Sequence, residues 1–211
     1  MFNFLSLITN RFFWKFFTII LIIILKIFYR IKIGKNCYFE GIPKLKLKGR
    51  KSESNIYIGN NVKFLGVVDF RLRENGKIII DDDVVIEENC RFVSARDGII
   101  HISGSTLVGS YAVWNGGGNI TVGKKCAISS GSRFNANEHQ NKKDQYIRDQ
   151  NFNYGNIVID DDCLIGTNVV VLKSVNIKCG SIIGANSVVT KDTEEYSING
   201  GVPSKFIKSR E

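Results

Sequence analysis

A six-residue repeat dominates the C-terminal part of the chain. Aliphatic residues recur at every sixth position, and these anchors are Ile159, Ile165, Val171, Ile177, Ile183 and Val189. The position four places after an anchor is small or β-branched, as in Cys163, Val169, Val175, Ser181 and Ser187. A period of six fits neither an amphipathic helix, with a period of about 3.6, nor an ordinary strand, with a period of about 2. It is typical of a parallel β-helix, in which short strands turn corners and stack coil on coil.

The same repeat can be followed towards the N-terminus in blocks of three. Three hexads make one triangular coil, and the earlier anchors are Ile80, Ile86 and Phe92, then Ile102, Val108 and Trp114, then Val122, Ile128 and Phe134. The repeat begins at Ile33-Gly34, and the alternating stretch 44–48 predicts an edge strand of an early coil. We therefore expect an all-β domain, a parallel β-helix, over residues 33–195, followed by a C-terminal tail, 196–211, that leaves the helix.

The repeat stops between Asn135 and Asn156. This segment is polar and charged, and it is long enough to project from the domain as an inserted loop over residues 135–157. Long loops in compact domains usually serve a function. We expect the loop to carry residues of a functional site.

Basic residues are concentrated before the repeat. The formal net charge is +9, and residues 1–50 hold ten Lys or Arg against one acid, Glu40, so the rest of the chain is balanced. Residues 1–32 read as one helix, with an apolar run over 12–29 and cations that share one face at Arg11, Lys15, Lys26 and Arg30.

Three interpretations of this N-terminal helix stay open. It can lie on a membrane surface, span the membrane, or pack against the domain or a partner subunit. The uncharged stretch Phe16–Leu25 is short beside the roughly 20 residues of a spanning helix, which favours the surface location. No small-residue cleavage site follows, so a signal peptide is not expected. The bulky aliphatic residues between the lysines argue against nucleic acid as a partner. We expect a cytoplasmic protein, peripheral at the inner face of the cytoplasmic membrane.

Four of the five cysteines fall in the small-residue positions of the repeat. They follow the anchors Ile33, Ile86, Val122 and Ile159 by four residues, and they are Cys37, Cys90, Cys126 and Cys163. A cysteine there behaves as a small hydrophobic residue. We expect core packing and no disulfide or metal role for these thiols.

The last coils carry a specific resemblance. The segments are IVIDDDCLIGTNVVVLKSVNIKCGSIIGANSVVTKD, from Ile157, and YSINGGVPSKFIKSR, ending at Arg210. They closely resemble the hexapeptide-repeat acyltransferases, in particular the sugar O-acetyltransferase branch with galactoside and maltose acetyltransferases and polysaccharide-modifying relatives. The resemblance implies a left-handed β-helix, acetyl-CoA as co-substrate without a metal, and a homotrimer with active sites between subunits. Where that family often has Pro-Gly at a corner, this chain has Lys173-Ser174.

A general base is the central requirement for acyl transfer from a thioester to a hydroxyl. A neutral imidazole suits this role at physiological pH, and the chain has two histidines. The family's catalytic histidine lies where the repeat is interrupted, which His139 matches. His101, in contrast, reads as an outward residue of a strand. Glu138 and Asp149 are candidates for orienting the imidazole, and Asn115, Glu138 and Arg148 are candidates for contacts with the acceptor.

The resemblance also implies positions along a CoA channel. Gly166-Thr167 and Ala185 match residues beside the pantetheine arm, and Thr190-Lys191 match the end of the channel near the nucleotide. Lys208 matches a basic residue at the adenosine phosphates, where a cation is suited to the charge of CoA.

Other functions are open to a β-helix. A carbonic anhydrase of this fold needs three histidine ligands for zinc, and the chain has only two histidines. A structural or ice-binding β-helix would give no reason for the polar loop. An N-acyltransferase acting on an amino sugar remains possible, because an amine can use the same base. The apolar N-terminal helix favours O-acetylation of a cell-envelope polysaccharide precursor, such as a capsule or O-antigen precursor, because an enzyme at the membrane meets a membrane-held acceptor at high effective concentration.

Overall fold

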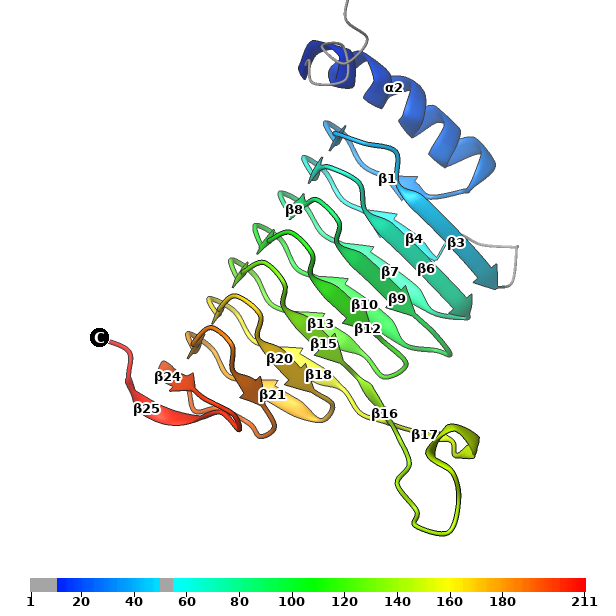
Figure 1. Ribbon diagram of the computed structural model, residues 1–211. Helices are drawn as coiled ribbons and strands as arrows, with labels where there is room; N and C mark the ends of the chain where they lie inside the picture. The colour runs from blue at the N-terminus through cyan, green and yellow to red at the C-terminus, as the bar shows by residue number, and fades with distance from the viewer. Residues whose placement is uncertain (1–10, 50–54) are drawn as a thin grey trace, which may run out of the picture.

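The computed structural model describes residues 11–49 and 55–211. Stacked coils form a three-sided prism, with one helix across its N-terminal end and one hairpin that projects from its side (Figure 1). Two of the three parallel sheets along the prism contain seven strands each, and the third contains nine. Seven coils with three strands each therefore make up the body of the domain.

Each sheet takes one strand from every coil. Sheet A contains β1 (Lys32–Ile33), β4 (Ile56–Ile58), β7 (Lys77–Ile80), β10 (Ile99–Ile102), β13 (Ile120–Val122), β18 (Ile157–Ile159) and β21 (Val175–Ile177). Sheet B contains β2 (Tyr38–Phe39), β5 (Lys63–Leu65), β8 (Val85–Glu87), β11 (Leu107–Val108), β14 (Ala127–Ile128), β19 (Leu164–Ile165), β22 (Ile182–Ile183), β24 (Ser197–Gly200) and β25 (Lys205–Ser209). Sheet C contains β3 (Lys44–Gly49), β6 (Asp69–Glu74), β9 (Arg91–Ser94), β12 (Val113–Asn115), β15 (Arg133–Asn135), β20 (Val170–Leu172) and β23 (Val188–Val189).

The predicted anchors form the core. All fifteen anchors from Ile80 to Val189 are almost completely buried, and residues one coil apart are in register, as Val122, Ile159 and Ile177 are in sheet A. Below sheet C, the aromatic side chains of Phe70, Phe92, Trp114 and Phe134 stack in a column, with successive ring-centroid distances of 5.5, 5.6 and 4.0 Å. The predicted β-helix is therefore confirmed. β3 lies at the edge of sheet C, which confirms the predicted edge strand.

The cysteine positions predicted from the repeat are also confirmed. Cys37, Cys90, Cys126 and Cys163 are buried, whereas Cys179 is half-buried. Burial raises the pKa of the Cys90 thiol to about 12, and its S–H donates to the carbonyl oxygen of Gly109 at 3.2 Å. These side chains fill space in the core.

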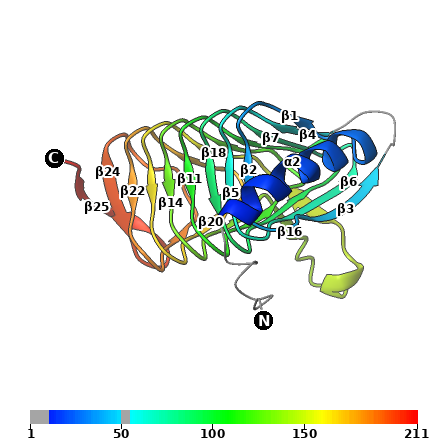
Figure 2. The same ribbon diagram turned by 90° about the horizontal axis from the view of Figure 1, so that it is seen from above.

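Helix α2 (Arg11–Phe28) covers the N-terminal end of the stack (Figure 2). Leu21 and Leu25 are buried beneath it. The Thr18 hydroxyl donates to the carbonyl oxygen of Phe39 and accepts from its N–H, both at 3.1 Å. The helix thus supplies the layer that closes an otherwise open core, which agrees with the interpretation that it packs against the domain.

The predicted helix boundary at residue 32 is wrong. The helix ends at Phe28, because Arg30 has a φ of 53° and turns the chain so that Ile31, 3% exposed, enters the core before β1. The predicted start of this helix lies outside the described residues. Within 11–49 and 55–211, no helix is long and apolar enough to cross a membrane.

The predicted inserted loop is a hairpin that leaves the prism after β15. β16 (Asn137–His139) pairs antiparallel with β17 (Phe152–Tyr154), and a short 3-10 helix, η1 (Ile147–Asp149), lies between them. Gln150 is the buried residue of the loop tip. Its side-chain amide accepts from the N–H of Lys142 at 2.8 Å and donates to the carbonyl oxygens of Lys142 and Gln145 at 2.8 and 2.9 Å. This one side chain gives the tip a defined shape.

The prediction that the chain leaves the β-helix at residue 196 is wrong for the start of the tail. β24 pairs parallel with β22 and extends sheet B, because Ser197 and Asn199 are buried at the C-terminal end of the core. Only β25 departs from the coil, and it runs antiparallel along β24.

Candidate active site

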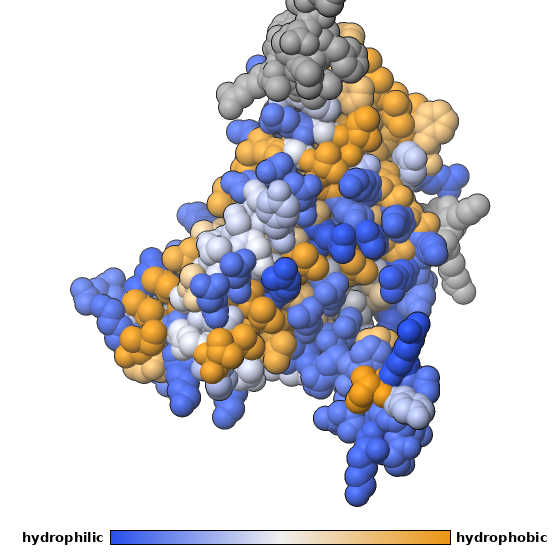
Figure 3. All heavy atoms as spheres, viewed as in Figure 1, coloured by the Kyte–Doolittle hydropathy of each residue, from blue (hydrophilic) through white to orange (hydrophobic). Residues whose placement is uncertain are grey.

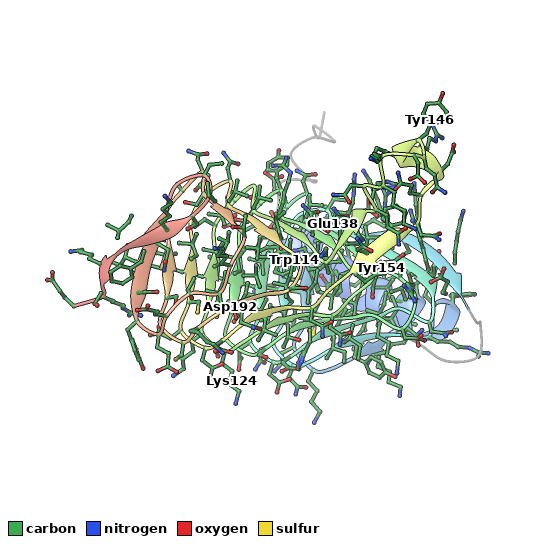
Figure 4. All side chains as sticks on the ribbon, turned by 90° about the horizontal axis from the view of Figure 1, so that it is seen from below. Trp114, Lys124, Glu138, Tyr146, Tyr154 and Asp192 are labelled. Carbon is green, nitrogen blue, oxygen red and sulfur yellow. The ribbon has the colours of Figure 1, made fainter. Side chains whose placement is uncertain are left out.

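The hairpin is fixed at its base by close packing. A Cβ added to Gly117 would lie 2.7 Å from a ring carbon of Tyr154, so a side chain at that position would displace the ring. On the same ring, the Arg96 guanidinium carbon lies 4.2 Å from the centroid. Figure 4 shows Glu138 and Tyr154 near the prism and Tyr146 at the far end of the hairpin. The glycine break after β12 therefore makes room for the returning strand.

His139 ends β16 and is exposed. Its ring centroid lies 4.0 Å from that of Phe152, its partner across the hairpin. The ring contact restricts the imidazole and leaves its nitrogen atoms without a hydrogen-bond partner among the described residues. A histidine in this state can accept a proton from a ligand placed beside the hairpin.

Glu138 points to the other side of the hairpin, because successive side chains of a strand alternate. Its carboxylate lies 3.1 Å from Nζ of Lys173, at the corner after β20. Asp149 lies in η1, towards the loop tip. In the described part of the chain, neither carboxylate contacts the imidazole, so the structure gives no support to either as the group that orients His139.

The other candidates for acceptor contacts lie apart from each other. Nδ2 of Asn115 donates to Oδ1 of Asn135 at 2.8 Å, on the outer side of sheet C one coil before the hairpin. Arg148 is exposed in η1 and far out on the hairpin. Asn115 is therefore at the base of the hairpin with His139, whereas Arg148 belongs to its tip.

The candidates for the CoA channel begin at a corner between sheets B and C. The N–H of Gly166 donates to the carbonyl oxygen of Ile183 at 2.9 Å, and the N–H of Asn186 donates to that of Thr167 at 2.8 Å. A Cβ on Gly166 would lie only 2.7 Å from the backbone nitrogen of Ala185. Two successive coils thus meet closely here, and Thr167 and Ala185 are exposed.

The remaining candidates continue along the C-terminal end of the prism. Thr190 and Lys191 are exposed directly after β23. Lys208 lies in β25 opposite Ile198, and its Nζ is 3.3 Å from a carboxylate oxygen of Glu211. These residues form a polar, accessible border of the last coils.

The two groups lie at opposite edges of sheet C. The corner with Thr167 precedes β20, and the corner with Lys173, which holds Glu138, follows it. Six residue steps separate the corners, which is up to about 20 Å along an extended chain. A single chain therefore does not bring His139 to the predicted CoA positions.

Several contacts of the hairpin are absent from the sequence-based prediction. Lys173 is known from the sequence only as a departure from Pro-Gly, yet it holds the hairpin through Glu138. Gln150 and Arg96 carry no sequence signal for their roles. The triple glycine was a usable signal, because it implies close approach of another backbone or ring.

The relationship to known proteins agrees with this geometry. No protein-family model matches the chain. A dTDP-4-amino-4,6-dideoxy-D-glucose acyltransferase from Escherichia coli is 32% identical over 175 residues, which cover 79% of this chain and 86% of the relative. This chain belongs to the hexapeptide-repeat acyltransferase family. That family has the left-handed form of the β-helix, so the fold predicted from the sequence is confirmed in full.

Two further members show which part is shared most widely. A chloramphenicol acetyltransferase from Klebsiella aerogenes is 33% identical over 108 residues, which cover 43% of this chain and 51% of that protein. The chain thus spans about half the length of this relative. A solved hexapeptide-repeat acetyltransferase from Vibrio cholerae, complexed with acetyl-CoA, is 31% identical with a TM-score of 0.51 and covers 53% of this chain and 61% of that one.

Proposed function

We propose that the protein is an acetyl-CoA-dependent O-acetyltransferase that modifies a hydroxyl of a sugar. The observation that carries the proposal is His139, exposed on a hairpin whose base is fixed by Tyr154 and by the pair of Glu138 with Lys173. Such a base at the interruption of an acyltransferase β-helix is suited to a hydroxyl acceptor. The bound hexapeptide-repeat relative in complex with acetyl-CoA supports the choice of donor.

The reaction is a direct transfer in a ternary complex. A nitrogen of His139 takes the proton of the acceptor hydroxyl while the oxygen attacks the carbonyl carbon of the thioester. The C–S bond then breaks, and the thiol of CoA leaves with the proton that the imidazole held. Backbone N–H groups or a nearby side chain stabilise the oxyanion between these steps. No covalent intermediate is needed, in accordance with the buried cysteines.

The donor would lie along the corner formed by Gly166, Thr167 and Ala185, towards Thr190 and Lys191, with Lys208 near the phosphates. This corner and His139 are at opposite edges of sheet C, so we propose that the site is completed between neighbouring copies in a homotrimer. Prisms with flat faces can pack around a threefold axis, and each interface then brings one hairpin to a neighbour's corner.

An N-acyltransferase is the second candidate. It is favoured by the Escherichia coli relative, whose named substrate is an amino sugar and which matches most of this chain. An amine acceptor would use the same hairpin and the same donor corner. The two candidates differ only in the nucleophile that meets His139.

The acceptor is proposed to be a precursor of a cell-envelope polysaccharide, held at the inner face of the cytoplasmic membrane. Helix α2 supports this location, because its outer face exposes Phe16, Ile19, Ile23 and Ile27 to between 52% and 65%. Lys15 and Lys26 flank them and can approach anionic headgroups.

Thiol release from acetyl-CoA tests the proposed activity. Purified protein is assayed with a panel of nucleotide sugars and glycans that carry hydroxyl or amino groups. We expect His139→Ala to lower kcat by about 100-fold or more. His101→Ala is the matched control, since His101 pairs with Asp81 at 3.0 Å on sheet A, away from the hairpin. Full activity of His139→Ala would contradict the assignment, and product analysis separates ester from amide.

Vesicle binding tests the membrane location. Complete deletion of the helix would uncover Leu21 and Leu25, so point substitutions on the outer face are preferable. Ile23→Ser/Ile27→Ser should lower sedimentation with phosphatidylglycerol vesicles while the far-UV circular dichroism stays unchanged. Equal sedimentation of this variant and the wild type would refute membrane binding by α2.

A further inference from the structure

Sheet C becomes wider towards the N-terminal end of the prism. β3 and β6 contain six residues each, whereas β12, β15 and β20 contain three. The additional length of β3 and β6 carries side chains that alternate between the core and the outer surface. Leu72 points inward and is 6% exposed, and Arg71 and Arg73, on either side of it, point outward.

The outward positions of this wide part are occupied by cations. In register across the sheet, Lys46 lies beside Arg71 and Lys48 beside Arg73, and the column that starts at Lys44 continues through Asp69 to Arg91. We call this set the basic face, and its members are Lys44, Lys46, Lys48, Arg71, Arg73 and Arg91. Figure 3 shows hydrophilic side chains gathered over this part of the prism, between α2 and the hairpin.

The acidic residues here do not neutralise the basic face. Asp69 is 9% exposed and forms ion pairs with Arg71 at 2.7 Å and with Arg91 at 3.3 Å. Glu74 lies at the end of β6. Among the residues that the structure describes, Lys46, Lys48 and Arg73 have no acidic partner. Like charges opposite each other on neighbouring strands are destabilising, and an anionic ligand would remove that cost.

The basic face leads directly to the proposed catalytic hairpin. One outward column runs through Lys46, Arg71, Val93, Asn115 and Asn135, with one residue from each successive coil. Coils are about 4.8 Å apart, so Arg71 lies about 14 Å from Asn135, which directly precedes the hairpin. A chain-like ligand that follows this column would pass from the cations to the hairpin base and His139.

The extent of the basic face indicates the kind of ligand. Along β3, Lys44 and Lys48 are separated by four residue steps, or about 13 Å, and cations continue over two more strands. A single diphosphate contacts only a part of this area. We propose that the basic face binds an acidic polysaccharide chain, the acceptor itself, and presents one of its sugars to His139. The inference rests on the proposed function for the reaction, but the binding it predicts does not require turnover.

Direct binding tests the proposal. The probe is fluorescein-labelled polygalacturonate, and neutral dextran, UDP-glucose and phosphatidylglycerol vesicles are the comparison ligands. The variant Lys46→Gln/Lys48→Gln/Arg73→Gln removes cations that have no ion-pair partner. The control Lys63→Gln/Lys77→Gln/Lys125→Gln removes the same charge from exposed positions outside sheet C. Far-UV circular dichroism establishes that both are folded.

We expect the first variant to bind polygalacturonate about tenfold more weakly, with a smaller dependence on salt, and the control to bind like the wild type. Equal affinity of the two variants would overturn the proposal. So would binding of UDP-glucose or vesicles that depends on the basic face when binding of polygalacturonate does not. If polygalacturonate binds as expected but no acceptor releases thiol from acetyl-CoA, the binding proposal stands and the proposed reaction fails.

Discussion

Trp114 is the residue whose removal should most clearly disturb the coil that precedes the hairpin. Its side chain is fully buried, and its ring stacks on Phe134 at 4.0 Å and on Phe92 at 5.6 Å. Trp114→Ala leaves a large cavity and removes both contacts, which should lower the free energy of unfolding by about 4 kcal/mol. In a solenoid each coil contacts only its neighbours, so the loss falls on the coil that holds Phe134 and the hairpin base.

Urea denaturation followed by far-UV circular dichroism measures this effect. Trp114→Phe is the informative control, since Nε1 of Trp114 has no hydrogen-bond partner among the described residues. Its removal ends a desolvation cost of about 1–3 kcal/mol and so offsets the smaller ring. We expect a net change within about 1 kcal/mol. A loss below about 1.5 kcal/mol for Trp114→Ala would refute the argument that the aromatic column supports sheet C.

Three further predictions concern the hairpin, an acidic group and a thiol. Lys173→Met should lower kcat about two- to fivefold through loss of its pair with Glu138, and Glu138→Gln should match it in the thiol-release assay; unchanged kcat in both would contradict the clamp. Burial disfavours the charge of Asp69, but the hydrogen bonds and charge of Arg71 outweigh it and lower the pKa of this carboxyl. Its stabilising effect is therefore present above the unfolded pKa of about 3.9 and is lost as the pH falls through the lower folded value. Thermal melts below about pH 4 should thus show a steeper decline for the wild type than for Asp69→Asn, and parallel curves would count against it. Burial raises the pKa of Cys90 to about 12, so a thiol reagent at neutral pH should modify it only after unfolding, as peptide mass mapping can show.

The hexapeptide period by itself determined most of the fold. Each coil repeats one local instruction, an apolar residue at every sixth position, so the inward side chains and the buried cysteines follow from spacing alone. The place of the hairpin follows in the same way, because it is where the period stops. His139 could be proposed as the base from that interruption and from the family resemblance.

The tertiary structure decided how distant residues meet at the site. The alternation of β16 directs His139 to Phe152 and Glu138 to Lys173, and no local pattern contains that pairing. The end of α2 at Phe28 depends on the demand of the core for Ile31, which is a long-range effect.

The register between coils likewise exists only in three dimensions. Lys46, Arg71 and Asn115 are far apart in the sequence, and parallel pairing aligns them in one column that ends at the hairpin. A local period specifies which side chains face the core. Which outward side chains become neighbours depends on the number of residues in each coil, and the corners and loops that set this number do not follow the period.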